Sequence, residues 1–225
     1  MDFKGIAKIY DKYKQEYGSD TYRKISQMLA EAKVIHKRDF RRRSSDGDHE
    51  QSWRAFKGKN LENLIRYIIC DEVRALGLEI INGNSLERTG NGKLSAQLEM
   101  VKRNLVVDFG EFGMHLPDVD LVVFNPKNSK VIAVLSSKVT LRERVAQTGY
   151  WKFKLMESKL TDSIKVFFLT LDEDGTLTQK IPTKKGRAIV EKDLDGTYVM
   201  TEANIDESDK VKLLDKFVDD LKKLI

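Results

Sequence analysis

The chain has 225 residues, of which 40% are hydrophobic and 33% charged, a composition typical of a globular protein with a sizeable core. A formal net charge of +5 favours a polyanionic partner, although the excess of positive charge is modest. One cysteine excludes a disulfide framework, and neither a signal core nor a run of about 20 apolar residues is present, so we expect a cytoplasmic protein outside the membrane.

The first 55 residues differ in pattern from the rest and are predicted to form a helical N-terminal region, followed by one domain over 56–225. Apolar residues at helical spacing predict two helices, which separate near residues 18–20. The segment 38–48, which contains Arg41, Arg42 and Arg43, is typical of an exposed basic loop. Such a loop could neutralise phosphates, and a solvated linker is an equally good interpretation.

The segment 58–76 has the apolar spacing of an amphipathic helix with one core-facing stripe. Glu62 lies at the edge of this stripe, beside Leu61 and Ile65. Its carboxylate is therefore expected to face the core or a cleft. A solvated glutamate in the first helical turn, favoured by the helix dipole, is the alternative.

Residues 77–116 carry weaker signals. They allow a short strand near 77–83, a helix over 95–103 and a strand over 105–110. The glycines of this region form no phosphate-binding loop, because no Gly-Lys-Ser/Thr element follows a strand. The three histidines of the chain have no metal-ligand spacing, which argues against a zinc site.

Two apolar strands, at about 119–124 and 131–138, are joined by turn-forming residues and predict a hairpin. Asp118 and Asp120 share a face at the start of the first strand, and Lys138 ends the second, so carboxylates and an ammonium should meet. This arrangement suits magnesium beside a lysine that polarises a water or a phosphate oxygen. A buried ion pair between Asp120 and Lys138 is the alternative interpretation.

These residues resemble the PD-(D/E)xK nuclease superfamily, to which many type II restriction endonucleases belong. The resemblance rests on Pro117-Asp118, the hairpin and the strand that ends in Lys138. The usual acidic residue two positions before the lysine is Ser136 here, as in members of the BsaWI-like branch that reads CCGG-type sites. The resemblance implies an α/β fold in which helices flank a mixed central sheet.

The resemblance also implies a site that binds Mg²⁺. In several relatives a glutamate about thirteen residues after the lysine completes the site, but that position is Trp151 here. Glu62 is therefore the preferred second carboxylate, and Glu143 and Glu157 are weaker candidates. The catalytic and metal-binding residues implied are Asp120, Lys138, Glu62, Asp118 and, through its backbone carbonyl, Ser137.

The cluster Arg142, Glu143 and Arg144 follows the lysine, as a similar cluster does in the same branch. Arginine reads guanine through O6 and N7, and glutamate can accept a hydrogen bond from cytosine N4, so the cluster suits G·C recognition. A surface charge cluster with internal salt bridges is the alternative. Farther along this helix, Gln147 could add a base contact and Lys152 a phosphate contact.

The last third of the chain is expected to complete the sheet. After a helix over 141–160, the apolar run 164–171 predicts a central strand parallel to the second hairpin strand. An antiparallel pair around Ile189 and Tyr198 and an amphipathic helix over 210–225 follow.

The resemblance implies a prokaryotic type II restriction endonuclease that cleaves double-stranded DNA at a palindrome, leaving 5′-phosphate ends. A homodimer is expected, because one site cuts one strand and a two-fold protein matches a two-fold sequence. Three alternatives stay open: a structure-specific repair or recombination nuclease, a catalytically silent DNA-binding relative, and an unrelated α/β protein that uses the hairpin as core.

Overall fold

The computed structural model describes residues 1–43, 47–87, 94–141 and 144–225, with only the backbone of Arg43 and Arg144. The α-helices are α1 (Phe3–Tyr17), α2 (Ile25–Arg43), α3 (His49–Ala75), α4 (Ala96–Arg103), α5 (Arg144–Met156), α6 (Lys185–Asp193) and α7 (Phe217–Lys222). The strands are β1 (Glu79–Asn82), β2 (Val107–Asp108), β3 (Met114–His115), β4 (Leu121–Phe124), β5 (Val131–Lys138), β6 (Lys165–Thr170), β7 (Gly196–Val199) and β8 (Val211–Leu213). Short 3-10 helices are η1 (Gly18–Lys24), η2 (Gly83–Ser85), η3 (Gly110–Phe112) and η4 (Leu214–Lys216).

The central sheet is mixed and has the strand order β1-β4-β5-β6-β7-β8. The strands β1, β4 and β5 pair antiparallel, whereas β5, β6, β7 and β8 pair parallel. All of β4 and all of β5 except Lys138 are buried, as expected for strands covered on both faces. The hairpin and the parallel strand predicted over 164–171 are therefore confirmed.

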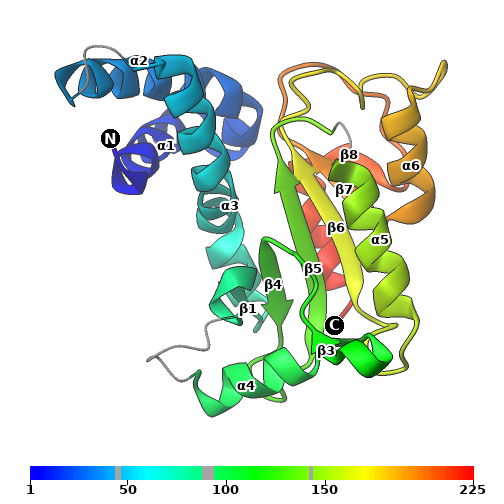
Figure 1. Ribbon diagram of the computed structural model, residues 1–225. Helices are drawn as coiled ribbons and strands as arrows, with labels where there is room; N and C mark the ends of the chain where they lie inside the picture. The colour runs from blue at the N-terminus through cyan, green and yellow to red at the C-terminus, as the bar shows by residue number, and fades with distance from the viewer. Residues whose placement is uncertain (44–46, 88–93, 142–143) are drawn as a thin grey trace.

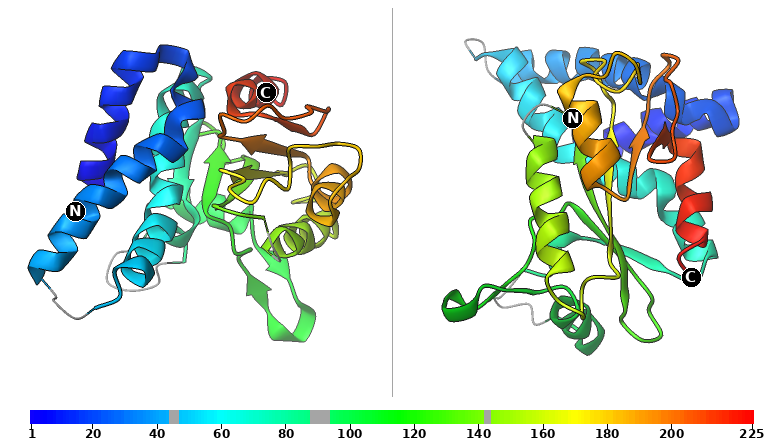
Figure 2. Two further views of the ribbon diagram at one scale, coloured as in Figure 1. Left: turned by 90° about the horizontal axis from the view of Figure 1, so that it is seen from above. Right: turned by 90° about the vertical axis from the view of Figure 1, so that its right-hand side faces the viewer.

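Helices cover both faces of this sheet (Figures 1 and 2). On one face, α3 and α7 pack with the N-terminal helices in a single hydrophobic core. On the other face, a second core contains residues of α4, α5 and α6. The mixed α/β fold with flanking helices is the predicted one. The strands β4 and β5 lie between the two layers of helices.

The N-terminal region is helical, as predicted, but residues 38–43 of its basic segment are helical and do not form a loop. The helix α2 continues to Arg43, so Arg41 and Arg42 lie in its last turns and not in a connection. The next helix, α3, begins after Asp48, whose side chain accepts hydrogen bonds from the amides of Glu50 and Gln51. It is 27 residues long and crosses the division predicted at residues 55–56 without a break.

The C-terminal third differs from the prediction in two elements. Ile189 belongs to the helix α6, because Arg187 and Val190 turn toward the core at helical spacing, and no strand forms there. The strand around Tyr198 is β7, which pairs parallel with β6 and with β8. The helix predicted over 210–225 is α7 alone, preceded by β8 and η4. These parallel pairings depend on contacts between distant segments, which local periodicity does not record.

Among the described residues, no helix combines the length and the apolar character that crossing a membrane requires.

Candidate active site

Antiparallel pairing of β4 with β5 brings Asp120 beside the end of β5. The register pairs Leu121 with Leu135, and the amide of Asp120 donates to the Leu135 carbonyl at 3.0 Å. The Asp120 Oδ2 accepts hydrogen bonds from the amide of Ser137 at 2.6 Å and from its hydroxyl at 3.0 Å.

The ammonium of Lys138 completes this contact. Its Nζ lies 3.1 Å from Asp120 Oδ2 and 3.4 Å from Oδ1. Oδ2 therefore takes three donors, whereas Oδ1 has only the longer contact in the described part of the chain. Since neither side chain is fully buried, with 32% of Lys138 and 18% of Asp120 exposed, both remain accessible to a ligand.

Glu62 projects from α3 into the same cavity as Asp120 and Lys138. The cavity has a volume of about 360 Å³. Burial raises the pKa of the half-buried Glu62 carboxyl, and the negative charge of Asp120 raises it further. The charge of Lys138 and a hydrogen bond with Asn82 act in the opposite direction. The residues that line the cavity are Gly58, Leu61, Glu62, Asp120, Ser137, Lys138, Val139 and Thr140.

This set of oxygen atoms fits a hard divalent cation. Asp120 and Glu62 lie in one cavity, where the negative charge of Asp120 disfavours a second negative charge on Glu62. A bound cation would offset this repulsion. In the described part of the chain, no three His, Cys, Asp or Glu side chains gather closely enough to hold a metal by themselves. A cation here would therefore need further oxygen ligands, which the backbone carbonyl of Ser137, waters and a substrate phosphate can provide, as is usual for Mg²⁺.

Asp118 has different neighbours from Asp120, although alternation along a strand would place them on one face. Its exposed carboxylate accepts a hydrogen bond from the Gln147 side chain of α5 at 2.8 Å. It is not among the residues that line the Glu62 cavity. The structure thus brings together Asp120, Glu62 and Lys138, and pairs Asp118 with a residue predicted to contact bases.

Most of the predicted base-recognition cluster cannot be placed. Arg142 and Glu143 lie outside the described residues, and Arg144 begins α5 with only its backbone described. Gln147 is exposed on the first turns of α5. The helix α5 begins at Arg144, shortly after β5 ends at Lys138.

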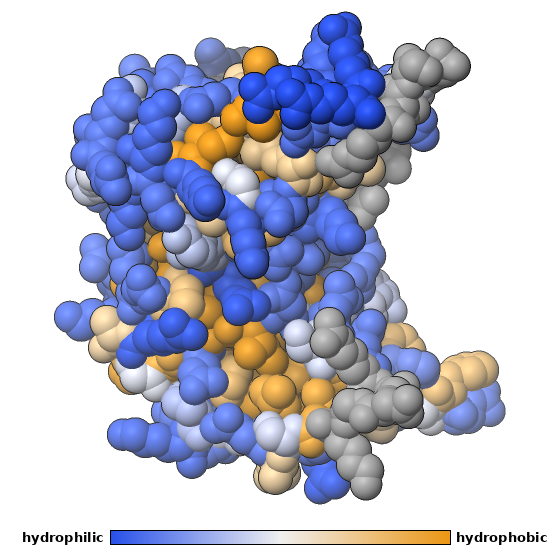
Figure 3. Space-filling model, turned by 90° about the vertical axis from the view of Figure 1, so that its left-hand side faces the viewer, coloured by the Kyte–Doolittle hydropathy of each residue, from blue (hydrophilic) through white to orange (hydrophobic). Residues whose placement is uncertain are grey.

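The residues predicted to contact the DNA backbone divide into two groups. Arg41 and Arg42 are exposed at the end of α2, where they line a shallow groove with Val34, Lys37 and Arg38. Figure 3 views the side of the molecule on which the N-terminal helices lie and shows a mostly hydrophilic surface with hydrophobic patches in it. The side chain of Arg43 is not described.

Lys152 does not belong to this exposed surface, which corrects the prediction. Only 8% of the residue is exposed, and its ammonium lies 2.7 Å from Asp195 Oδ2. The same oxygen accepts a hydrogen bond from the amide of Val166 in β6. Lys152 therefore joins α5 to the sheet and the residue before β7, and it has no free charge to offer a phosphate.

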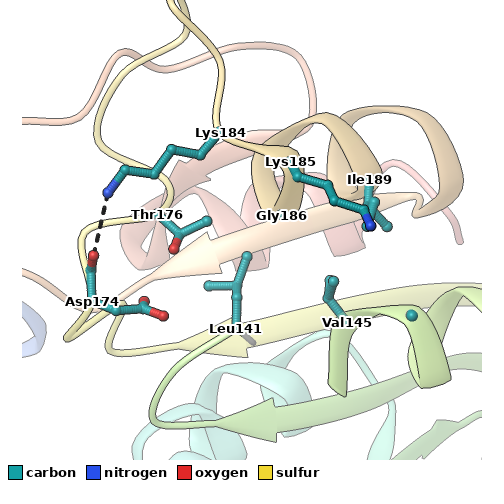
Figure 4. A pocket seen from close by; sticks show the side chains of 9 residues that line it. Leu141, Val145, Asp174, Thr176, Lys184, Lys185, Gly186 and Ile189 are labelled. Carbon is teal, nitrogen blue, oxygen red and sulfur yellow. Dashed lines mark hydrogen bonds between the residues drawn. The ribbon is translucent and has the colours of Figure 1, made fainter. Parts of the chain in front are cut away.

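A second cavity of similar size, about 380 Å³, lies between the start of α5 and α6 (Figure 4). Leu141 and Val145 form an apolar side of it, and Lys184 crosses it to donate to the carbonyls of Asp174 and Gly175 at 3.5 and 3.0 Å. Its lining has one carboxylate, that of Asp174, and lacks the pair found with Lys138. The two cavities have similar volumes, but the one with Glu62 holds two carboxylates beside a lysine and this one holds a single carboxylate.

The model of the family described as "BsaWI restriction endonuclease type 2" matches residues 97–220, which is more than half of the chain and includes β4, β5 and α5. This chain belongs to the BsaWI restriction endonuclease family. The resemblance to restriction enzymes of the PD-(D/E)xK type is therefore confirmed.

Known relatives of this BsaWI-family chain agree with the assignment. The putative type II restriction enzyme MjaVIP of Methanocaldococcus jannaschii is 34% identical over an alignment of 226 positions. The alignment covers 98% of this chain and 93% of the relative. The restriction endonuclease AgeI, solved in a specific complex with DNA, superimposes with a TM-score of 0.54 at 16% identity, over 99% of this chain and 91% of that one. PspGI, solved with substrate DNA, gives 0.53 at 13% identity, over 97% and 92%. The two structures show that the fold is shared.

Sequence reasoning missed one residue of this BsaWI-family site, Asn82. The sequence predicts only a short strand near 77–83, and β1 confirms it. No periodicity reveals that the Asn82 side chain bonds Asn63 and Arg66, because these contacts join the end of β1 to the middle of α3.

Proposed function

We propose that this chain is a type II restriction endonuclease that cleaves double-stranded DNA at a palindromic site, requires Mg²⁺ and leaves 5′-phosphate ends. The observation that carries the proposal is the convergence of Asp120, Glu62 and Lys138 in one accessible cavity of a BsaWI-family chain. We propose the cytoplasm as its place of action, in keeping with its single free cysteine, Cys70.

Each residue of the cavity has a role that follows from its chemistry. Asp120 Oδ1, Glu62 and the carbonyl of Ser137 would hold Mg²⁺, which would supply positive charge to the scissile phosphate. Lys138 would orient the attacking water and stabilise the negative charge that develops on the phosphate oxygens. The Ser137 hydrogen bonds to Oδ2 would fix the Asp120 carboxylate and leave Oδ1 for a ligand. Asp118, held by Gln147, is the alternative acidic residue.

We assign recognition of the DNA sequence to the start of α5. Arg142, Glu143 and Arg144 would read base edges in the major groove, and Gln147, exposed on the same helix, would add a contact. The exposed Arg41 and Arg42, with Arg43, would neutralise backbone phosphates and strengthen binding without regard to sequence.

A homodimer is the proposed state on a palindrome. Large apolar side chains follow one another along the outer face of α5 and the turn after it, at spacings of three and four residues. Roughly half of each is exposed, which is unusual for a helix that already has a buried face. The residues of this stripe are Tyr150, Phe153, Met156 and Leu160. Because α5 begins at the proposed recognition residues, a second copy on this stripe would bring two recognition segments to one DNA duplex.

Replacing Phe153 with Asp is expected to separate the dimer, since two copies cannot bury unpaired carboxylates at a shared two-fold contact. Light scattering at micromolar concentration, with and without a duplex that contains the site, should then give one 25.9 kDa chain for the variant and two chains for the wild type, once the mass of any bound duplex is subtracted. Met100→Asp, at an exposed apolar residue of α4, serves as the control. A wild type that stays monomeric on its DNA contradicts the dimer, and a dimeric Phe153→Asp variant moves the interface elsewhere.

The proposed function is tested by incubating the protein with unmethylated phage DNA and Mg²⁺, with EDTA as control, and sequencing the ends of the fragments. Discrete fragments whose ends share one palindrome and carry 5′-phosphates are expected. Cleavage of junctions or mismatches alone would replace the proposal by a structure-specific nuclease, and binding without cleavage would replace it by a silent relative.

A further inference from the structure

The end of β1 contacts the elements that carry both carboxylates of the proposed site. Asn82 pairs in register with Leu121, the residue after Asp120, and the amide of Gly83 donates to the Asp120 carbonyl at 2.9 Å. The side chain of Asn82 hydrogen-bonds with Asn63, the residue after Glu62 in α3. The last residue of β1 and the first of η2 thus contact the helix that carries Glu62 and the backbone of Asp120.

The amide group of Asn82 is itself held by α3. Its Nδ2 donates to Asn63 Oδ1 at 3.0 Å, and its Oδ1 accepts from Arg66 Nη1 at 2.6 Å. These contacts use a donor and an acceptor on separate atoms of one short side chain, as a primary amide supplies them. A carboxylate at position 82 would keep the Arg66 contact but could not donate to Asn63.

Gly83 has a steric reason to lack a side chain. A Cβ at this position would lie 2.0 Å from the carbonyl oxygen of Val119 and 3.1 Å from the Val119 carbonyl carbon. Both atoms belong to the backbone immediately before Asp120, so a side chain could be accommodated only by moving that backbone. The end of β1 therefore packs directly on the main chain that positions Asp120.

We propose that Asn82 and Gly83 form a positioning pair that sets the distance between the Glu62 and Asp120 carboxylates for the cation they share. Asn82 fixes the part of α3 that carries Glu62 relative to the end of β1, and Gly83 fixes the Asp120 main chain relative to the same end. Neither residue touches the reacting atoms. The inference rests on the proposed function, because the cation is the reason for bringing two carboxylates together.

Asn82→Ala is the decisive variant, because it removes the hydrogen bonds that tie β1 to the part of α3 that carries Glu62 and leaves the backbone of β1 in place. The expected result is about 10- to 100-fold weaker binding of Mn²⁺, the size of effect usual when a residue that orients a metal ligand is removed. Binding is measured by electron paramagnetic resonance on the full chain without DNA. The half-saturating Mg²⁺ concentration in single-turnover cleavage should rise by a similar factor, with a smaller loss of rate at saturating Mg²⁺.

The matched control is Asn104→Ala. Asn104 is also a partly buried amide, but it donates to the carbonyl of Ser129 in the turn between β4 and β5, away from the carboxylates. Its Mn²⁺ affinity should equal that of the wild type, and both variants should unfold at similar temperatures. Mn²⁺ affinity within twofold of the wild type in Asn82→Ala would overturn the proposal, and so would an equal loss in both variants, which would mark a general structural effect.

The same measurements separate this inference from the proposed function. If the wild type binds Mn²⁺, Asn82→Ala weakens that binding and neither protein cuts any DNA, the positioning pair stands and the nuclease proposal fails. If both proteins cut DNA with the same Mg²⁺ dependence, the nuclease proposal stands and the positioning pair fails.

Discussion

Lys138→Ala is expected to lower the rate of DNA cleavage by about 10²- to 10⁴-fold, the range in which a positioned side chain assists proton transfer and charge stabilisation. The ammonium of Lys138 is the cationic group nearest to Asp120 in the described part of the chain, at 3.1 Å, and it lines the same cavity. Single-turnover cleavage at saturating Mg²⁺ measures the effect. Binding of the specific duplex in Ca²⁺ should change little, because one partly buried lysine contributes little to the total phosphate contact.

Two comparisons make the Lys138 result specific. Lys138→Met keeps the apolar stem of the side chain and should lose activity to the same degree, which separates the charge from packing. Lys130→Ala removes an exposed lysine from the turn before β5 and should cleave like the wild type. Cleavage by Lys138→Ala at the wild-type rate would refute the assigned site.

Arg187→Ala is expected to lower the free energy of unfolding by about 3–5 kcal/mol, the cost of breaking a buried ion pair by removing one partner. The Arg187 side chain is fully buried. It donates to the carbonyls of Leu177 and Asp206 and lies 3.2 Å from Glu191 Oε1. Glu191 also accepts hydrogen bonds from the Ser208 hydroxyl. The substitution would leave a carboxylate and two carbonyls without their charged donor.

Urea unfolding followed by circular dichroism measures the Arg187 effect. Lys192→Ala, at an exposed residue of the same helix, is the control and should lie within about 0.5 kcal/mol of the wild type. A similarly small change for Arg187→Ala would mean that water replaces the buried guanidinium contacts.

The central part of the site could be predicted from the sequence because local patterns determine it. Two apolar strands joined by a tight turn must pair antiparallel, and this pairing brings Asp120 to the end of the strand that carries Lys138. The position of Glu62 at the edge of an apolar helical stripe also predicted a carboxylate that faces a cleft. In each case the pattern within one hairpin or one helix is enough to predict which way the side chain faces.

Other parts of the site depend on contacts between elements. Asp118 lies before β4 begins, so strand alternation does not govern its direction, and its carboxylate turns to Gln147 of α5. Lys152 lies on a helix with a polar pattern, but its neighbour Asp195 comes from 43 residues farther along the chain. The hydrogen bond of Asn82 to Asn63 of α3 is of the same kind. Tertiary pairing of polar groups leaves no periodic signature.

The hydrophobic core on the α3 side of the sheet has a consequence for how such nucleases can diverge. Ile6 and Met28 of the N-terminal helices belong to the same core as Leu64 of α3 and Leu135 of β5. A chain divided at residues 55–56 would expose apolar surface on both fragments. Exchanging the N-terminal helices for those of another enzyme would therefore disturb this core unless the residues that face it were exchanged as well.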